Sequence, residues 1–295
     1  TQELNNQIYT SIQKSAPFLA GKIGSTELLV CLWHLGWRPW TRLGIKPSWN
    51  STQYLEIGAG IFPRTTESYH KFATSYINTL GKIDCLGIWH NEGEMKLVSK
   101  FAPETKIGNF LGLEPYLISE KPWTHALANK KILVVTAFAK TLAQQIPKLS
   151  KIWIKYQKKN SQTLIPESTK FTVVKFPYGF DPEIQQKYGS WENIFAKVTA
   201  EIEQHNFDIV LLGCGGYSLL LGAHIKKMGK SVIHLGGATQ ILFGIRGSRW
   251  EKKPWFIENL NDYWTYPLTE DKPGKKAMQN RAKLMHNPGE IACYW

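Results

Sequence analysis

The chain has 295 residues and a formal net charge of +13, with 36 Lys and Arg against 23 Asp and Glu. Its 12 Trp, 12 Tyr and 13 Phe exclude a disordered chain, because disordered segments are poor in aromatic residues. The four cysteines are widely spaced, which argues against a disulfide framework or a structural zinc site and favours a reducing, cytoplasmic compartment.

Strands and helices are expected to alternate along the chain. Apolar spacing predicts helices over residues 6–18, 25–35, 69–80, 141–154 (broken by Pro147), 191–205 and 218–228. Short apolar runs predict one strand that starts at Phe18 and further strands over residues 84–89, 132–136, 169–176, 208–212 and 231–235. This alternation predicts an α/β fold, a Rossmann-like and mostly parallel sheet with helices on both faces. We expect one domain over residues 1–295, with a basic extension from about residue 246, and no membrane span.

Two glycine-containing turns late in the chain follow predicted strands. The first contains Gly213, Gly215, Gly216 and Tyr217, and the second contains His234, Gly236, Gly237 and Thr239. Such turns let backbone N–H groups approach an anion at the start of a helix. The alternative is that the glycines only allow each helix to pack closely against its strand.

Two turns near the N-terminus carry carboxylates. The turn at residues 20–28 contains Lys22, Gly24, Ser25 and Glu27. Glu27 is either a helix-stabilising acid in a first turn or a base or metal ligand at the mouth of a site. Glu92 follows the strand predicted at 84–89, and ligands of open α/β sheets bind at such strand ends, so Glu92 is the second candidate base.

Residues 54–63 offer a competing pattern. They read Glu-x-Gly-x-Gly after apolar residues, which is the arrangement that S-adenosylmethionine-dependent methyltransferases place at their first strand. Phe62 and Pro63 stand where a third small residue is usual, and an acidic residue does not end the next predicted strand. The methyltransferase interpretation is therefore an alternative rather than the first choice.

Positive charge is concentrated late in the chain. Residues 226–283 contain twelve Lys and Arg against five acidic residues. Arg246, Arg249, Trp250, Lys252 and Lys253 directly follow the second glycine turn. The segment is either a solvated surface or a site for phosphates, nucleic acid or an anionic membrane.

These segments together resemble the glycosyltransferases of the GT-D type, the family of the former domain of unknown function 1792. That family has Arg-Phe-Gly-Asp-Gly-Glu where this chain has Lys-Ile-Gly-Ser-Thr-Glu at residues 22–27. Its later strand ends in Asp-Ile-Gly-His, where residues 233–237 read Ile-His-Leu-Gly-Gly. A lysine-led strand with an apolar turn at 130–141 is also similar, and the resemblance covers most of residues 15–245.

The resemblance implies an enzyme that transfers a sugar from a nucleotide-sugar donor to a hydroxyl of a glycan or other acceptor. Glu27 or Glu92 would be the base. The donor would contact Lys22, Gly24, Ser25, Gly213, Gly215, Gly216, Tyr217, His234, Gly236, Gly237, Thr239, Arg246, Arg249 and Trp250.

The family's divalent metal, Mn²⁺ or Mg²⁺, is in doubt for this chain. Ser25 and Gly237 stand where two of its ligands are expected, and only Glu27 is kept. One carboxylate is a poor Mg²⁺ site, so the basic residues at 246–253 could stabilise the diphosphate instead.

Two further interpretations stay open, the methyltransferase and a non-enzymatic basic module for nucleic acid or anionic lipid. The chain lacks the sequence signatures of the common nucleic-acid-binding domains, so nucleic acid is not the expected partner. Peripheral membrane contact through the basic surface is a further expectation. The sequence leaves open the donor sugar and base, the acceptor, the stereochemical outcome and the oligomeric state.

Overall fold

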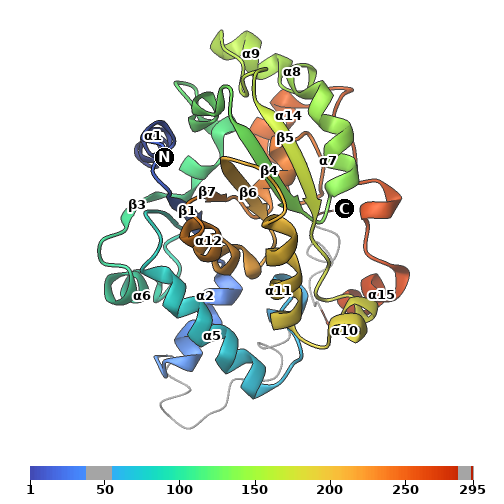
Figure 1. Ribbon diagram of the computed structural model, residues 1–295. Coiled ribbons are helices and arrows are strands. Elements are labelled where there is room, and N and C mark those ends of the chain that lie inside the picture. Colours follow the sequence, from blue (N-terminus) through green and yellow to red (C-terminus); the bar gives the residue numbers. More distant parts are fainter. Residues whose placement is uncertain (38–54, 285–293, 295) are drawn as a thin grey trace.

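A seven-stranded sheet organises the described part of the chain, in the order β3-β2-β1-β7-β6-β4-β5 (Figure 1). The computed structural model describes residues 1–37, 55–284 and 294. The strands are β1 (Leu19–Lys22), β2 (Cys85–Ile88), β3 (Lys106–Asn109), β4 (Lys131–Thr136), β5 (Lys170–Lys175), β6 (Ile209–Gly213) and β7 (Ser231–His234). Every neighbouring pair is parallel. The predicted α/β, Rossmann-like fold is confirmed.

Helices cover both faces of the sheet. One face carries α2 (Ser25–His34), α5 (Thr66–Leu80), α6 (Glu94–Phe101), α11 (Trp191–Ile202) and α12 (Tyr217–Lys227). The other carries α1 (Gln2–Gln13), α7 (Ala139–Gln145), α8 (Leu149–Ile152), α9 (Ile154–Asn160), α13 (Ala238–Leu242) and α14 (Pro254–Asn259). Two more helices, α10 (Pro182–Tyr188) and α15 (Lys275–Leu284), follow β5 and end the described segment.

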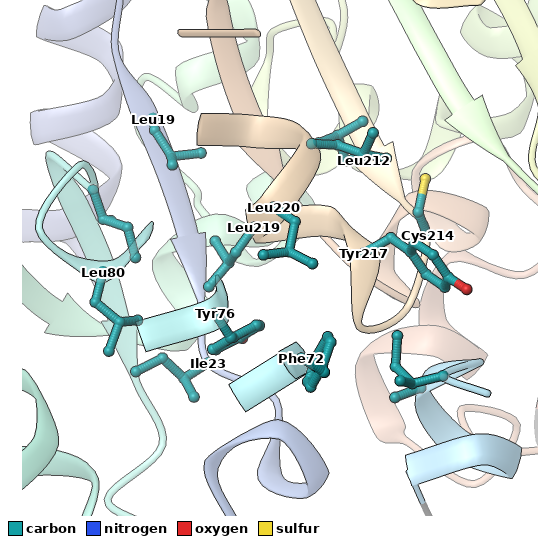
Figure 2. Packing of buried hydrophobic residues seen from close by; sticks show 14 of the residues in the cluster. Leu19, Ile23, Phe72, Tyr76, Leu80, Leu212, Cys214, Tyr217, Leu219 and Leu220 are labelled. Atoms are coloured by element: carbon teal, nitrogen blue, oxygen red, sulfur yellow. The ribbon is translucent and has the colours of Figure 1, made fainter. Parts of the chain in front are cut away.

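Two hydrophobic clusters, one on each face, hold the layers together. Leu133 and Val135 of β4 point into the first cluster, and Ile132 and Val134 point into the second. Because both faces are covered, the central strands are apolar throughout instead of alternating with polar residues. Figure 2 shows the first cluster, where side chains of β1, α5 and α12 meet.

Most predicted elements are found, with shifted ends. The first helix spans Gln2–Gln13 rather than 6–18, and Pro147 breaks the helix after β4 through a 3-10 turn at Ile146–Lys148. The uncharged run 209–225 divides into β6, a glycine turn and α12, as expected. Strand β3 was missed because its sequence, Lys-Ile-Gly-Asn, has a single large apolar residue.

In the described segments 1–37 and 55–284, the helices are too short or too polar for any of them to cross a bilayer.

Asp271 fastens the C-terminal segment to the sheet. Its carboxylate is fully buried, and Oδ2 accepts hydrogen bonds from the backbone N–H of Thr141 at 2.6 Å and from Thr141 Oγ1 at 2.8 Å. Its Oδ1 lies 3.3 Å from Lys175 Nζ at the end of β5. The segment after β7 is thereby connected to both β5 and the first turn of α7.

Replacing Asp271 by Ala should lower the free energy of unfolding by about 3 kcal/mol, because the partners of a buried charge are left unpaired. Urea unfolding measures the change. Glu270→Ala is the matched control: its exposed carboxylate lies 3.6 Å from Lys140 Nζ, and we expect a loss of less than about 0.5 kcal/mol. Equal losses in the two variants would contradict the role given to Asp271.

Candidate functional site at the carboxyl ends of β1 and β7

The centre of the sheet has a topological switch point. β1 pairs with β2 on one side and with β7 on the other, so chain order reverses between β1 and β7. In open parallel sheets, ligands bind in the crevice outside the strand ends at such a point. The predicted site turns at residues 22–27, 89–94, 213–217 and 234–239 all leave the carboxyl ends of β1, β2, β6 and β7.

Lys22, the last residue of β1, is buried at this point. Its Nζ lies 4.9 Å from the ring centroid of Trp89 and 5.6 Å from that of Phe110, two rings that stack on each other at 3.7 Å. The pKa of Lys22 is lowered to about 8, mainly by burial; the carboxylate of Glu114 opposes the shift, and the positive charge of Arg249 contributes to it. The amine is therefore a cation at neutral pH that can lose its proton more readily than an exposed lysine.

His234, at the end of β7, is buried beside Lys22. A Cβ on Gly236 would lie 3.5 Å from His234 Cε1 and 3.6 Å from Lys22 Cε, so Gly236 leaves room for both side chains. Burial and the charge of Lys22 lower the pKa of His234 to about 3, although a contact with the carbonyl of Leu212 favours the protonated ring. His234 is therefore neutral at physiological pH.

Arg249 is the second cation of the site. Its Nη1 donates to the hydroxyl of Tyr294 at 3.0 Å, and its guanidinium lies 5.8 Å from the ring centroid of Trp250. A Cβ on Gly237 would lie 3.2 Å from the Trp250 ring, so the glycine lets this ring pack onto the turn after β7. The positive charge of Arg249 also lowers the pKa of Lys22.

Arg246 has a different role from Arg249. Its Nη2 and Nε lie 2.9 and 3.2 Å from Glu251 Oε1, and its guanidinium stacks 4.4 Å from the ring centroid of Tyr266. The charge of Arg246 is thus matched within its own loop. Both arginines were predicted to contact the donor, whereas of the two only Arg249 affects the pKa of Lys22.

Glu27 occupies the first turn of α2 and is buried. A Cβ on Gly24 would lie 2.0 Å from Glu27 Oε2, and one on Gly216 would lie 3.4 Å from Glu27 Oε1. The carboxyl group therefore lies where the turns after β1 and β6 meet, in space that the two glycines leave. Burial raises the pKa of Glu27, and a hydrogen bond to its own backbone amide opposes this rise. A buried carboxyl group with a raised pKa is a candidate for proton transfer.

The loop after β2 is fastened to the start of α2. Asn91 Nδ2 donates to Ser25 Oγ at 3.1 Å, and Glu92 is exposed on the same loop. Glu94 is fully buried, and its Oε2 accepts from the N–H groups of Trp89 and Asn91, each at 3.1 Å. Burial raises the pKa of Glu94, while these amides oppose the rise. Glu94 thereby positions Trp89 over Lys22.

Sequence reasoning missed three site residues, namely Trp89, Glu94 and Glu114. Glu114 is buried and accepts from the hydroxyl of Tyr116 at 2.9 Å, which keeps its charge close to Lys22. Glu94 follows a glycine that starts a helix, a local signal that could have been used. Glu114 lies between two short 3-10 turns, and its sequence context contains no comparable signal.

The glycine turn after β6 is used mainly for packing. The N–H of Gly216 donates to the carbonyl of Ala59 at 3.0 Å. Gly215 has a φ of +55°, and a Cβ there would lie 3.0 Å from the same carbonyl oxygen. Tyr217 is fully buried, and its hydroxyl donates to the carbonyl of Gly60 at 2.9 Å.

Gly213 and Thr239 also lie within packed structure. A Cβ on Gly213 would lie 2.9 Å from Thr239 Oγ1, and Thr239 itself is buried at the start of α13. The contacts of the β6 turn therefore favour the packing interpretation of its glycines.

The competing Glu-x-Gly-x-Gly pattern does not end a strand. Residues 55–59 form a helix, and residue 54 lies outside the described residues. Glu56 accepts from Gln185 Nε2 at 2.8 Å and pairs with Arg64 at 2.7 Å, so both of its oxygens are engaged. The expectation that this motif follows a first strand, as in a methyltransferase, is wrong.

The residues at the site do not fit a divalent metal. Within segments 1–37 and 55–284, three His, Cys, Asp or Glu side chains do not come together in a way that could hold an ion. Glu27 lies against Gly24 and Gly216, whereas His234 lies against Lys22.

Two hollows of about 320 and 410 Å³ flank α11, and the predicted site residues are not among those that line them. Comparison with known proteins adds no assignment: no family model, curated protein or solved structure matches this chain.

Replacing Lys22 by Met should raise the free energy of unfolding at pH 7 by about 1–3 kcal/mol, because folding then buries no ammonium group. Between pH 8 and 10.5 the folded protein holds fewer protons on Lys22 than the unfolded chain does. The stability of the unaltered protein should therefore rise over that range, and the advantage of the variant should shrink.

Urea unfolding at pH 7 and at pH 10 measures this difference. Lys14→Met, which alters an exposed lysine, is the control and should show no such pH dependence. A Lys22→Met protein that is less stable at pH 7 would contradict the burial cost assigned to Lys22.

Proposed function

We propose that this protein is a glycosyltransferase that transfers a sugar from a nucleotide-sugar donor to a hydroxyl group of an acceptor such as a glycan. The observation that carries the proposal is a buried lysine, Lys22, at the switch point of a parallel sheet, with Gly236 of the next turn against Lys22 and Gly237 against the Trp250 ring that borders Arg249. The resemblance of residues 22–27 and 208–237 to GT-D glycosyltransferases supports the same function.

The two cations suit the diphosphate of a donor. Arg249 offers a planar guanidinium that can hold two phosphate oxygens, and Lys22 adds a point charge. Lys22 is buried and Arg249 is exposed, and fixed cations such as these stabilise the negative charge that develops on the leaving diphosphate. Trp89 and Trp250 border the cations and offer aromatic faces that suit a sugar ring or a nucleobase.

Glu27 is the first candidate base. In the proposed step its carboxylate takes the proton of the acceptor hydroxyl, and the acceptor oxygen bonds to the anomeric carbon. The bond between that carbon and the diphosphate oxygen breaks, and the nucleoside diphosphate leaves with the electron pair. Glu92, exposed on the loop joined to Ser25 through Asn91, is the second candidate.

We further propose a reducing, cytoplasmic location. Cys31, Cys85 and Cys214 are buried free thiols. Cys293 lies outside the described residues. Burial raises the pKa of each of the three described thiols, which keeps them protonated and unreactive.

Binding of nucleoside diphosphates and nucleotide sugars, measured by calorimetry across a panel of bases, tests the donor site. Arg249→Gln should weaken the best ligand by about tenfold or more, since one charge-assisted phosphate contact is lost. Arg246→Gln is the matched control, because that guanidinium is already paired with Glu251, and it should change affinity less than about threefold. Failure of every donor to bind at millimolar concentration would refute the proposal.

Glu27→Gln should lower kcat by about 10²–10⁴-fold with little change in donor affinity, because a general base is removed. Glu92→Gln is compared under the same conditions. Since burial raises the pKa of Glu27, the rate of the unaltered enzyme should fall as the pH drops through that raised pKa. If Glu92→Gln alone abolishes turnover, Glu92 is the base; if both variants keep full activity, neither residue is.

A further inference from the structure

The most lysine-rich part of the chain is distant in sequence from the basic loop at the site. Residues 130–175, from the start of β4 to the end of β5, contain ten lysines and a single acidic residue, Glu167. This segment therefore carries nine net positive charges in 46 residues, more than the seven in residues 226–283.

Half of these lysines lie on α8, α9 and the turn before them. The exposed lysines there are Lys148, Lys151, Lys155, Lys158 and Lys159. Lys159 pairs with Glu258 at 2.8 Å, whereas Lys155 Nζ donates to the carbonyl of Leu260 at 2.8 Å, a neutral group. Within the described residues, one of these five charges is balanced by an ion pair.

Exposed hydrophobic side chains accompany these lysines. Ile257 on α14 is 57% exposed, Tyr263 is 42% exposed, and Ile154 on α9 is 37% exposed. Helices α9 and α14 pack against each other, and Lys151 Nζ lies 5.3 Å from the ring centroid of Tyr263. We call this combined surface, made by Ile154, Ile257, Tyr263 and the lysines of α8 and α9, the α9–α14 face.

We propose that the α9–α14 face docks on an anionic lipid bilayer. Aliphatic side chains that insert at the acyl boundary, a tyrosine at headgroup level and a ring of basic side chains are the features of an interfacial membrane surface. Lysine suits it because its apolar stem lies along the interface while its ammonium group reaches the headgroups. Clustered lysines gain attraction from the negative surface potential of the membrane.

The composition of the face favours lipid over nucleic acid. All ten basic residues of 130–175 are lysines, whereas base recognition depends heavily on arginine, asparagine and glutamine. Exposed isoleucines gain little from phosphates but are stabilised in the acyl region. Glu258, which pairs with Lys159, and Asp262, which precedes Tyr263 in the chain, reduce the charge of the face without reversing it.

Docking in this way leaves the candidate site accessible. Helices α8 and α9 lie at the top of Figure 1, away from α2, whose first turn carries Glu27. The proposal concerns a surface outside the turns that bind the donor, and its test does not require transferase activity.

Co-sedimentation of the full chain with vesicles tests the proposal. We expect binding to phosphatidylcholine vesicles that contain about one-third phosphatidylglycerol, weak binding to pure phosphatidylcholine, and a steep loss as salt rises. Replacing Lys148, Lys151 and Lys158 by Gln should lower the partition coefficient about tenfold or more. Ile257→Gln should lower it about threefold or more, an effect that persists at higher salt.

Two controls match these variants. Replacing Lys14, Lys82 and Lys106 by Gln removes the same charge from exposed positions elsewhere on the described surface, and Met95→Gln removes an exposed apolar side chain from α6. Both should bind vesicles like the unaltered protein. The proposal is overturned if anionic vesicles do not bind at low salt or if the control triple variant loses as much. It is also overturned if replacing Lys148, Lys151 and Lys158 weakens binding to DNA or RNA oligonucleotides but leaves binding to vesicles unchanged.

Discussion

The burial of one ammonium group at the end of β1 is the constraint around which the centre of the sheet is built. A desolvated cation is costly unless its surroundings compensate. Lys22 obtains partial compensation from the Trp89 and Phe110 rings and from the Glu114 carboxylate. Arg249 works against it, since a second positive charge makes it more costly to keep Lys22 protonated. An anionic ligand would relieve both cations at once, which is why we interpret the arrangement as a binding site.

The supporting residues keep this arrangement in place. Glu94 holds the loop that carries Trp89, and Tyr116 holds Glu114. His234 stays neutral beside Lys22, so the ring adds no further positive charge. Gly236 and Gly24 leave the volume into which Lys22, His234 and Glu27 extend. A side chain at either glycine would therefore disturb the site before it disturbed the hydrophobic clusters.

The sequence allowed the fold to be predicted because its central strands are strongly apolar. Residues 132–135 and 209–212 are apolar on both faces, which only a covered parallel strand explains well. The edge strand β3 has no such pattern.

The site was predicted in part: the strand-end positions of Lys22, Glu27 and His234 are local features of the chain. Tertiary structure brings Glu114 close to Lys22, and the spacing of the two residues along the sequence gives no sign of this proximity. The sequence also contains no sign that Arg246 pairs with Glu251, because either Arg246 or Arg249 could have turned toward the site.

The net charge of +13 therefore serves two physically different purposes in our interpretation. Lys22 is buried, in surroundings that mobile ions screen little, although Arg249 is exposed. The lysines of α8 and α9 are exposed and hydrated, and their attraction to an anionic surface decays within a Debye length. Salt should consequently separate the two interactions, weakening attachment at the α9–α14 face before it weakens the binding of a diphosphate between Lys22 and Arg249. The net positive charge thus includes a buried cation, Lys22, whose interaction with an anion is strengthened by desolvation. It also includes the exposed lysines of α8 and α9, whose attraction to an anionic surface is screened by salt.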